Sequence, residues 1–168
     1  MELTGGQVLL RPLTASDTAE LVRIRRTPQV AAAWDDVDEE PDFPFEEPDC
    51  ERWCIEVAGQ VVGMIQACQE LTPKYRHASI DLFVDPAVHG RGIGRDAVRA
   101  LARHLIDDCG HHRLVIDPSA ANAAAIRCYT SVGFRPVGVM RSYERDPGGR
   151  GWHDGLLMDL LAADVAAG

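Results

Sequence analysis

The stretch IDLFVDPAVHGRGIGRDAVRALARHL, residues 80–105, carries the strongest structural signal in the chain. It opens at the end of a mostly apolar run, residues 78–84, which is typical of a strand. Three glycines then lead into a helix: Gly90, Gly92 and Gly94. Apolar side chains recur at intervals of three and four over residues 92–109, which predicts an amphipathic helix. The loop N–H groups and the helix N-terminus both attract anions, so this stretch predicts a phosphate site, to which Arg91 and Arg95 add positive charge.

Two common nucleotide motifs do not fit this glycine-rich loop. A nucleotide P-loop needs Lys followed by Ser or Thr after the last glycine, and Arg95-Asp96 stands there instead. A dinucleotide fingerprint belongs to an early βαβ unit, whereas several predicted strands precede this loop. The loop therefore belongs to neither class.

The rest of the chain alternates strand and helix patterns without an internal repeat or linker. Helices are predicted after the capping pair Ser16-Asp17 and from Asn122 to a stop at Gly133. A β-hairpin is predicted around Gly59-Gln60. The predicted strands cover residues 7–12, 52–58, 61–70, 78–84, 113–116, 135–143 and 155–161. This order predicts a mixed α/β domain.

Length and composition predict one compact domain over residues 1–168. A hydrophobic share of 46% is enough to build a single core. No apolar run approaches the roughly 20 residues of a membrane span, and the N-terminus lacks the blocks of a secretion signal, so we expect a cytoplasmic protein with no membrane partner. We expect no metal site and only free thiols, because the cysteines are odd in number and none has zinc-site spacing: Cys50, Cys54, Cys68, Cys109 and Cys128.

The net charge of −9 comes from one acidic segment, residues 27–51. This segment holds ten acids and no base, whereas the rest of the chain has 17 bases against 16 acids. Such a distribution argues against a nucleic-acid partner and favours a cationic one. A solvated surface loop is the alternative interpretation of the same charge run.

A second motif, NAAAIRCYTSVGF at residues 122–134, combines with the glycine loop into a family resemblance. The order and separation of the two motifs resemble the GNAT superfamily of N-acetyltransferases. The loop of that family reads Arg or Gln, two residues, Gly, one residue, then Gly or Ala, and this chain departs from the pattern only in having His89 at the first place. The resemblance implies the GNAT fold, a mixed and mostly antiparallel sheet of about six or seven strands with a splayed parallel central pair and about four helices.

The resemblance also implies acetyl-CoA as co-substrate. The pantetheine arm would pair with the backbone of Phe83 and Val84, and Asn122 would hold it. Tyr129 would donate a proton to the leaving thiolate, although a core tyrosine is the alternative. The pyrophosphate would lie on the loop formed by His89, Gly90, Arg91, Gly92, Ile93, Gly94 and Arg95.

Two aspartates are candidates for the base that deprotonates the attacking amine. Asp81 lies inside an otherwise apolar strand, where an acid is costly unless it is paired or functional. Asp117 follows the next predicted strand, although it could simply make the turn before Pro118.

Local likeness to the aminoglycoside 6′-N-acetyltransferases implies a small polycationic acceptor. The implied acceptor-binding residues are Trp34, Asp35, Gln66, Asp81, Asp117 and Asp154. A protein N-terminus or lysine side chain is an alternative acceptor, since an acidic site also suits basic peptides. A non-catalytic acyl-CoA-binding module is the alternative of another class. The sequence leaves open whether the chain is a monomer or a homodimer.

Overall fold

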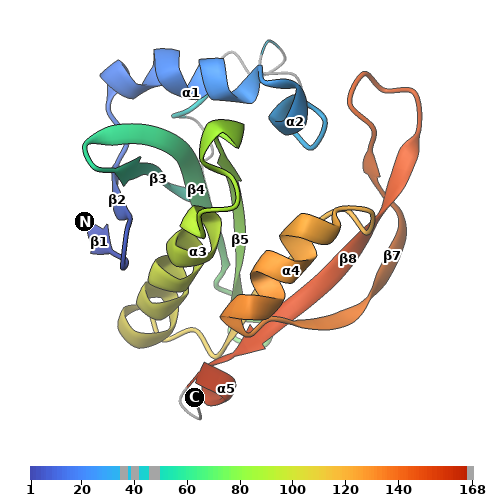
Figure 1. The fold of residues 1–168 in the computed structure, drawn as a ribbon. Helices are drawn as coiled ribbons and strands as arrows, with labels where there is room; N and C mark the ends of the chain where they lie inside the picture. Colours follow the sequence, from blue (N-terminus) through green and yellow to red (C-terminus); the bar gives the residue numbers. More distant parts are fainter. Residues whose placement is uncertain (35–37, 39–41, 46–49, 166–168) are drawn as a thin grey trace.

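A computed structural model describes residues 1–34, 38, 42–45 and 50–165 of the chain. These residues form one eight-stranded sheet with the strand order β1-β2-β3-β4-β5-β6-β8-β7 (Figure 1). The strands are β1 Leu3–Thr4, β2 Leu9–Pro12, β3 Cys50–Val57, β4 Gln60–Glu70, β5 His77–Val84, β6 Arg113–Ile116, β7 Arg135–Arg145 and β8 Trp152–Leu161. The helices are α1 Thr18–Arg25, α2 Pro28–Ala31, α3 Ile93–Arg103, α4 Ala123–Val132 and α5 Ala162–Val165.

The parallel pair at the centre of the sheet, β5 and β6, separates soon after it begins. Only Ala78 pairs with Leu114 and Ser79 with Val115, whereas β5 stays paired with β4 along its whole length. The sheet therefore opens between β5 and β6 from residue 80 onward. This is the splayed parallel pair that the family resemblance implies.

Helices cover both faces of the sheet. Successive strand residues point to opposite faces, so Ile80 packs in the core beneath α3 whereas Phe83 packs with the α1 side chains Leu21 and Ile24. Asp81 has the same parity as Phe83 and therefore points to the α1 face. The opening between β5 and β6 thus has a different helix layer on each side.

A carboxylate fixes the N-terminal turn of α3 against the β1–β2 loop. Asp96 accepts hydrogen bonds from the backbone N–H groups of Gly6, Gln7 and Val8 at 2.9, 2.6 and 3.1 Å. Burial alone would raise the pKa of Asp96, but these hydrogen bonds outweigh it and hold the pKa below its ordinary value. The acid in the first turn of α3 is therefore directed away from the glycine loop.

The numbers of strands and helices are close to those that the family resemblance implies. The sheet has eight strands because the two-residue β1 adds an edge, and the five described α-helices include the single turns α2 and α5. The hairpin turns at Ala58-Gly59, whose φ angles are 50° and 79°, one residue earlier than predicted.

The expectation of five free thiols is wrong. Cys50 and Cys68 form a disulfide, because the β3–β4 register places them opposite each other with Cα atoms 4.1 Å apart. Strand register is a long-range property that cysteine spacing does not reveal. The other three cysteines are free thiols.

No helix among the described residues is long and apolar enough to cross a membrane. Much of the acidic segment, Asp35 included, lies outside the described residues.

Candidate active site

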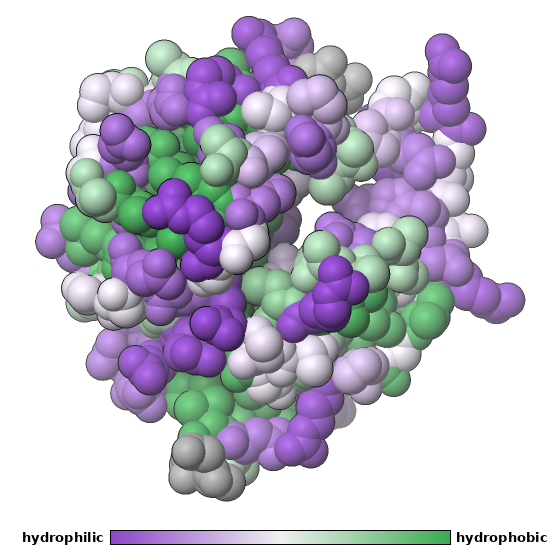
Figure 2. Space-filling model, in the orientation of Figure 1, coloured by the Kyte–Doolittle hydropathy of each residue, from purple (hydrophilic) through white to green (hydrophobic). Residues whose placement is uncertain are grey.

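A cavity of about 660 Å³ lies beside the glycine loop, between the splayed end of β5 and α4. We call it the loop cavity. Its wall contains all of the predicted co-substrate residues together with Trp34 of the acceptor set: Trp34, Phe83, Val84, residues 89–95, Asn122 and Tyr129. Figure 2 also shows the molecule hollowed between the part that carries α1 and α2 and the β7–β8 hairpin.

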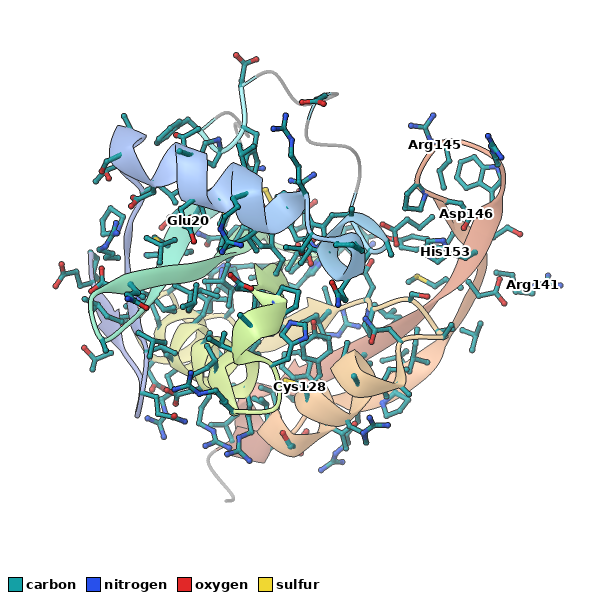
Figure 3. The ribbon with its side chains drawn as sticks, turned by 45° about the horizontal axis from the view of Figure 1, so that its top comes forward. Glu20, Cys128, Arg141, Arg145, Asp146 and His153 are labelled. Carbon is teal, nitrogen blue, oxygen red and sulfur yellow. A yellow bond between two sulfur atoms is a disulfide. The ribbon has the colours of Figure 1, made fainter. Side chains whose placement is uncertain are left out.

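The glycine loop has the backbone that its sequence predicts. Gly90 and Gly92 have φ angles of 75° and 78°, in the left-handed region where a Cβ is disfavoured. Gly92 is the N-cap of α3, so the first N–H groups of the helix face outward without an intrahelical carbonyl. Gly94 has no such requirement, since a Cβ there would lie at an ordinary contact distance of 3.8 Å from Sγ of Cys128, where α4 faces α3 (Figure 3).

The β5 backbone N–H and C=O groups that face the opening are those of Leu82 and Val84. The Asp85 N–H bonds to the β4 carbonyl of Val62 at 2.7 Å, and backbone direction alternates along a strand, so Phe83 also directs its backbone toward β4. The backbone role expected of Phe83 therefore moves to Leu82. The ring nitrogen Nε2 of His89 donates to the Val84 carbonyl at 2.9 Å, so the residue that departs from the family pattern lies directly on this edge.

The two side chains predicted to hold the thioester end both come from α4. Asn122 is the N-cap of that helix, and its side-chain oxygen accepts from the Ala125 N–H at 3.1 Å. Tyr129 is 8% exposed, and its ring lies 6.4 Å from that of Phe134. Burial, together with the charges of Asp81 and Asp117, raises the pKa of Tyr129 above its ordinary value. The phenol is therefore protonated at neutral pH, as a proton donor must be.

Asp81 and Asp117 lie on either side of the opening. The parallel register pairs Ser79 with Val115, so these two aspartates stand two residues further along their strands, where β5 and β6 have separated. The charges of Asp117 and of Glu144 on β7 both act on Asp81. We call Asp81, Asp117 and Glu144 the acid cluster. The charges of Asp81 and Asp117 also reach Tyr129, which lines the loop cavity.

The chemistry of Asp81 follows from its position. Its side chain is exposed to solvent within the opening, where the surrounding protein removes part of its hydration. Desolvation raises the pKa of Asp81 to about 7, helped by the Asp117 and Glu144 charges and opposed by a hydrogen bond from the Leu82 N–H. A carboxyl with that pKa can accept and release a proton at neutral pH.

The remaining residues predicted to bind the acceptor have other contacts. Gln66 pairs with Asp81 across β4 and β5, and its oxygen accepts from Arg52 at 2.8 Å. Trp34 packs edge-on against Phe83 with ring centroids 5.1 Å apart. Asp35 lies outside the described residues, and the carboxylate of Asp154 accepts from the backbone N–H of Ser142 at 2.8 Å.

Sequence reasoning missed several residues at this site. Tyr143 and Glu144 reach the acid cluster from β7, which the sequence marks only as a closing strand. The Arg25 guanidinium lies 4.9 Å from the Trp34 ring centroid and 4.8 Å from that of Phe43. A sequence pattern offers no signal for these contacts, which depend on how distant elements pack.

The comparisons with known proteins agree with this geometry. The profile of the Acetyltransferase (GNAT) family matches residues 18–134, which is more than half of the chain. The protein therefore belongs to the GNAT family.

Two curated relatives match this chain over only part of their length. N-alpha-acetyltransferase RimI of Mycobacterium tuberculosis is 39% identical over 77 residues, 46% of this chain and 46% of that protein. Aminoglycoside N(6′)-acetyltransferase type 1 of Klebsiella pneumoniae is 41% identical over 59 residues, 35% of this chain and 29% of that protein. The chain spans about half the length of the first relative and 29% of the length of the second. Neither relative therefore defines the acceptor of this chain.

Solved structures share the fold over nearly the whole chain. Mycobacterium smegmatis RimJ in complex with CoA-disulfide has a TM-score of 0.82 at 23% identity, covering 98% of this chain and 88% of its own. AAC(6′)-Ib in complex with ribostamycin and coenzyme A has a TM-score of 0.76 at 24% identity, covering 95% and 96%. These identities establish the fold alone.

Proposed function

We propose that this chain is an acetyl-CoA-dependent N-acetyltransferase that acts on a primary amine of a small polycationic molecule, foremost the 6′-amine of an aminoglycoside. The observation that carries the proposal is that Tyr129, on the wall of the loop cavity, lies within reach of the charges of Asp81 and Asp117 at the opening between β5 and β6. One side suits a pyrophosphate and a pantetheine, and the other suits ammonium groups.

Different residues of the loop cavity would bind different parts of acetyl-CoA. The pyrophosphate would accept hydrogen bonds from the first N–H groups of α3, with Arg91 and Arg95 adding charge. The pantetheine amides would pair with the backbone edge of Leu82 and Val84, where His89 would have to release the Val84 carbonyl. Asn122 lines the same cavity. Acetyl-CoA supplies the activated acyl group.

The reaction needs one base and one proton donor. Asp81 would take a proton from the acceptor ammonium, and the freed nitrogen would form a bond to the thioester carbonyl carbon. The C–S bond then breaks, Tyr129 would donate its proton to the departing sulfur, and the second proton lost by the attacking nitrogen would return through solvent to Tyr129. A raised tyrosine pKa disfavours a fully separated phenolate, so Tyr129 would share its proton only as charge develops on sulfur.

The acid cluster supports a cationic acceptor. A molecule with several ammonium groups loses much hydration on binding, and fixed carboxylates offset that cost. The Klebsiella pneumoniae relative is named for an aminoglycoside acceptor.

A protein N-terminus is the second candidate acceptor. The similarity to RimI, which extends over a longer stretch than the aminoglycoside match, favours it. A basic peptide would use the same carboxylates, so the geometry alone does not separate the two.

The test is thiol release from acetyl-CoA with kanamycin, spermidine and a basic peptide at low salt. Saturable turnover with kanamycin above all supports the proposal, whereas preference for the peptide supports the second candidate. Initial rates that intersect when both substrates are varied indicate direct attack in a ternary complex, and parallel lines indicate an acyl-enzyme. Acetyl-CoA binding without turnover on any amine would refute the catalytic proposal.

A further inference from the structure

The β7–β8 hairpin carries a bulge beside the acid cluster. Met140 pairs with Gly155 and Glu144 with His153, so three residues of β7 stand opposite Asp154 alone. Within this bulge Ser142 adopts a φ of 46°, a left-handed conformation that costs a non-glycine residue energy. Its backbone N–H donates to the Asp154 carboxylate at 2.8 Å, which stabilises the bulge.

The bulge directs Tyr143 across a neighbouring strand. β8 lies between β7 and β6, yet the Tyr143 hydroxyl comes within reach of Asp117, the residue that follows β6, where the Leu156 N–H of β8 donates to the neighbouring Pro118 carbonyl at 2.8 Å. The ring crosses β8 at Gly155, where a Cβ would lie 2.9 Å from Cδ1 of Tyr143. Gly155 is therefore required by this crossing and not by its own backbone angles.

We propose that Tyr143 is a positioning residue of the acceptor site, placed over Asp117 by a bulge that Asp154 and Gly155 build. The Asp117 side chain stands on a loop, free to rotate unless another group holds it. The Tyr143 hydroxyl donates to one lone pair of the Asp117 carboxylate and fixes its orientation. The remaining lone pairs can then accept hydrogen bonds from an ammonium group of the amine substrate. Asp154 then acts through the bulge and not as an ammonium ligand.

This inference rests on the proposed function and concerns the acceptor side alone. Tyr143→Phe removes only the hydroxyl, and Gly155→Ala displaces the ring. Each is expected to raise KM for the best amine of the panel about tenfold, the effect of one oriented hydrogen bond to a charged group, and to leave KM for acetyl-CoA unchanged. Tyr75→Phe is the matched control, because Tyr75 is 64% exposed in the β4–β5 loop.

The two substitutions of Asp154 separate positioning from direct binding. An asparagine oxygen still accepts from the Ser142 N–H, so Asp154→Asn is expected to rescue most of the acceptor KM that Asp154→Ala loses. Equal losses in the two variants would mean that the charge of Asp154 contacts the acceptor, which overturns the positioning role.

Calorimetric titration of the same amine into the CoA-bound protein gives a readout independent of turnover. If the wild-type protein acetylates an amine and the Tyr143→Phe variant binds and acetylates that amine equally well, this inference is overturned and the proposed function stands. A wild-type protein that neither binds nor acetylates any amine overturns both.

Discussion

Replacing Asp81 by Asn tests the proposed base through activity and stability at once. Asn keeps the size of the side chain and its hydrogen bond from the Leu82 N–H but cannot accept a proton at neutral pH. Loss of a positioned general base lowers kcat/KM for the amine by about 10²–10⁴-fold. KM for acetyl-CoA should change little, because Asn keeps the hydrogen bond from the Leu82 N–H and residue 81 does not line the loop cavity.

The pH dependence sharpens this prediction. The pKa of Asp81 is about 7, so wild-type log kcat/KM should rise with unit slope at low pH and level off above about pH 7. Without the base the rate should follow the free amine, whose ammonium titrates near ~10 as in lysine, so the variant profile should keep rising past pH 8. Initial rates of thiol release from pH 5.5 to 9.5 provide the measurement.

The same substitution should stabilise the fold. Ionised Asp81 is disfavoured in the native state, because its pKa is raised from the ordinary 3.8 to about 7. This cost is fully present above the folded pKa and disappears as the pH falls toward 3.8. Solvent screens the exposed carboxylate, so the gain in unfolding free energy at pH 8 should be only on the order of 1 kcal/mol.

If the Asp81→Asn variant is inactive, and is more stable than wild type at pH 8 but equally stable at pH 4, then Asp81 is kept for function at a cost in stability. Activity within about threefold of wild type, or an unchanged pH profile, would refute the assignment of Asp81 as the base.

Three further predictions concern the thioester end, the loop and the disulfide. Tyr129→Phe should lower kcat by about 10²-fold with little change in KM for acetyl-CoA, and steady-state kinetics will measure it; an unchanged kcat would exclude Tyr129 as the donor. Gly92→Ala, at a φ of 78°, should cost about 1 kcal/mol of stability and raise KM for acetyl-CoA, whereas Gly94→Ala meets Cys128 at an ordinary 3.8 Å and should do neither. Similar behaviour of the two variants in thermal melts and kinetics would contradict the distinction. Reduction of the Cys50–Cys68 disulfide, which closes a separation of 18 residues, should lower the unfolding free energy by about 3 kcal/mol in denaturant titrations; the Cys50→Ser variant should match reduced wild type and show no response to reductant.

The sequence predicts the parts of this protein whose signals are local. The glycine loop, the α3 periodicity and the Asn122 cap depend on residues within a turn or two of one another, and each forms where expected. Contacts between distant elements are different. The Cys50–Cys68 disulfide depends on strand register, which spacing along the chain does not encode.

The site divides along the same line. Residues on the loop and on α4 are predicted from their motifs and line one cavity. Tyr143 has no motif, because its place near Asp117 depends on a bulge opposite Asp154 and on a glycine in the intervening strand. The backbone assignment of Phe83 shifts to Leu82 because a difference of one residue reverses the direction of a strand's N–H and C=O groups.

The proposed reaction transfers an acetyl group from acetyl-CoA to an amine at the β5–β6 opening. The most direct test is mass spectrometry of the acceptor after incubation with isotopically labelled acetyl-CoA, with released CoA measured in the same sample. We expect one labelled acetyl group on a primary amine for each CoA released. Release of CoA without a labelled amine, or with the label on the protein alone, would contradict it.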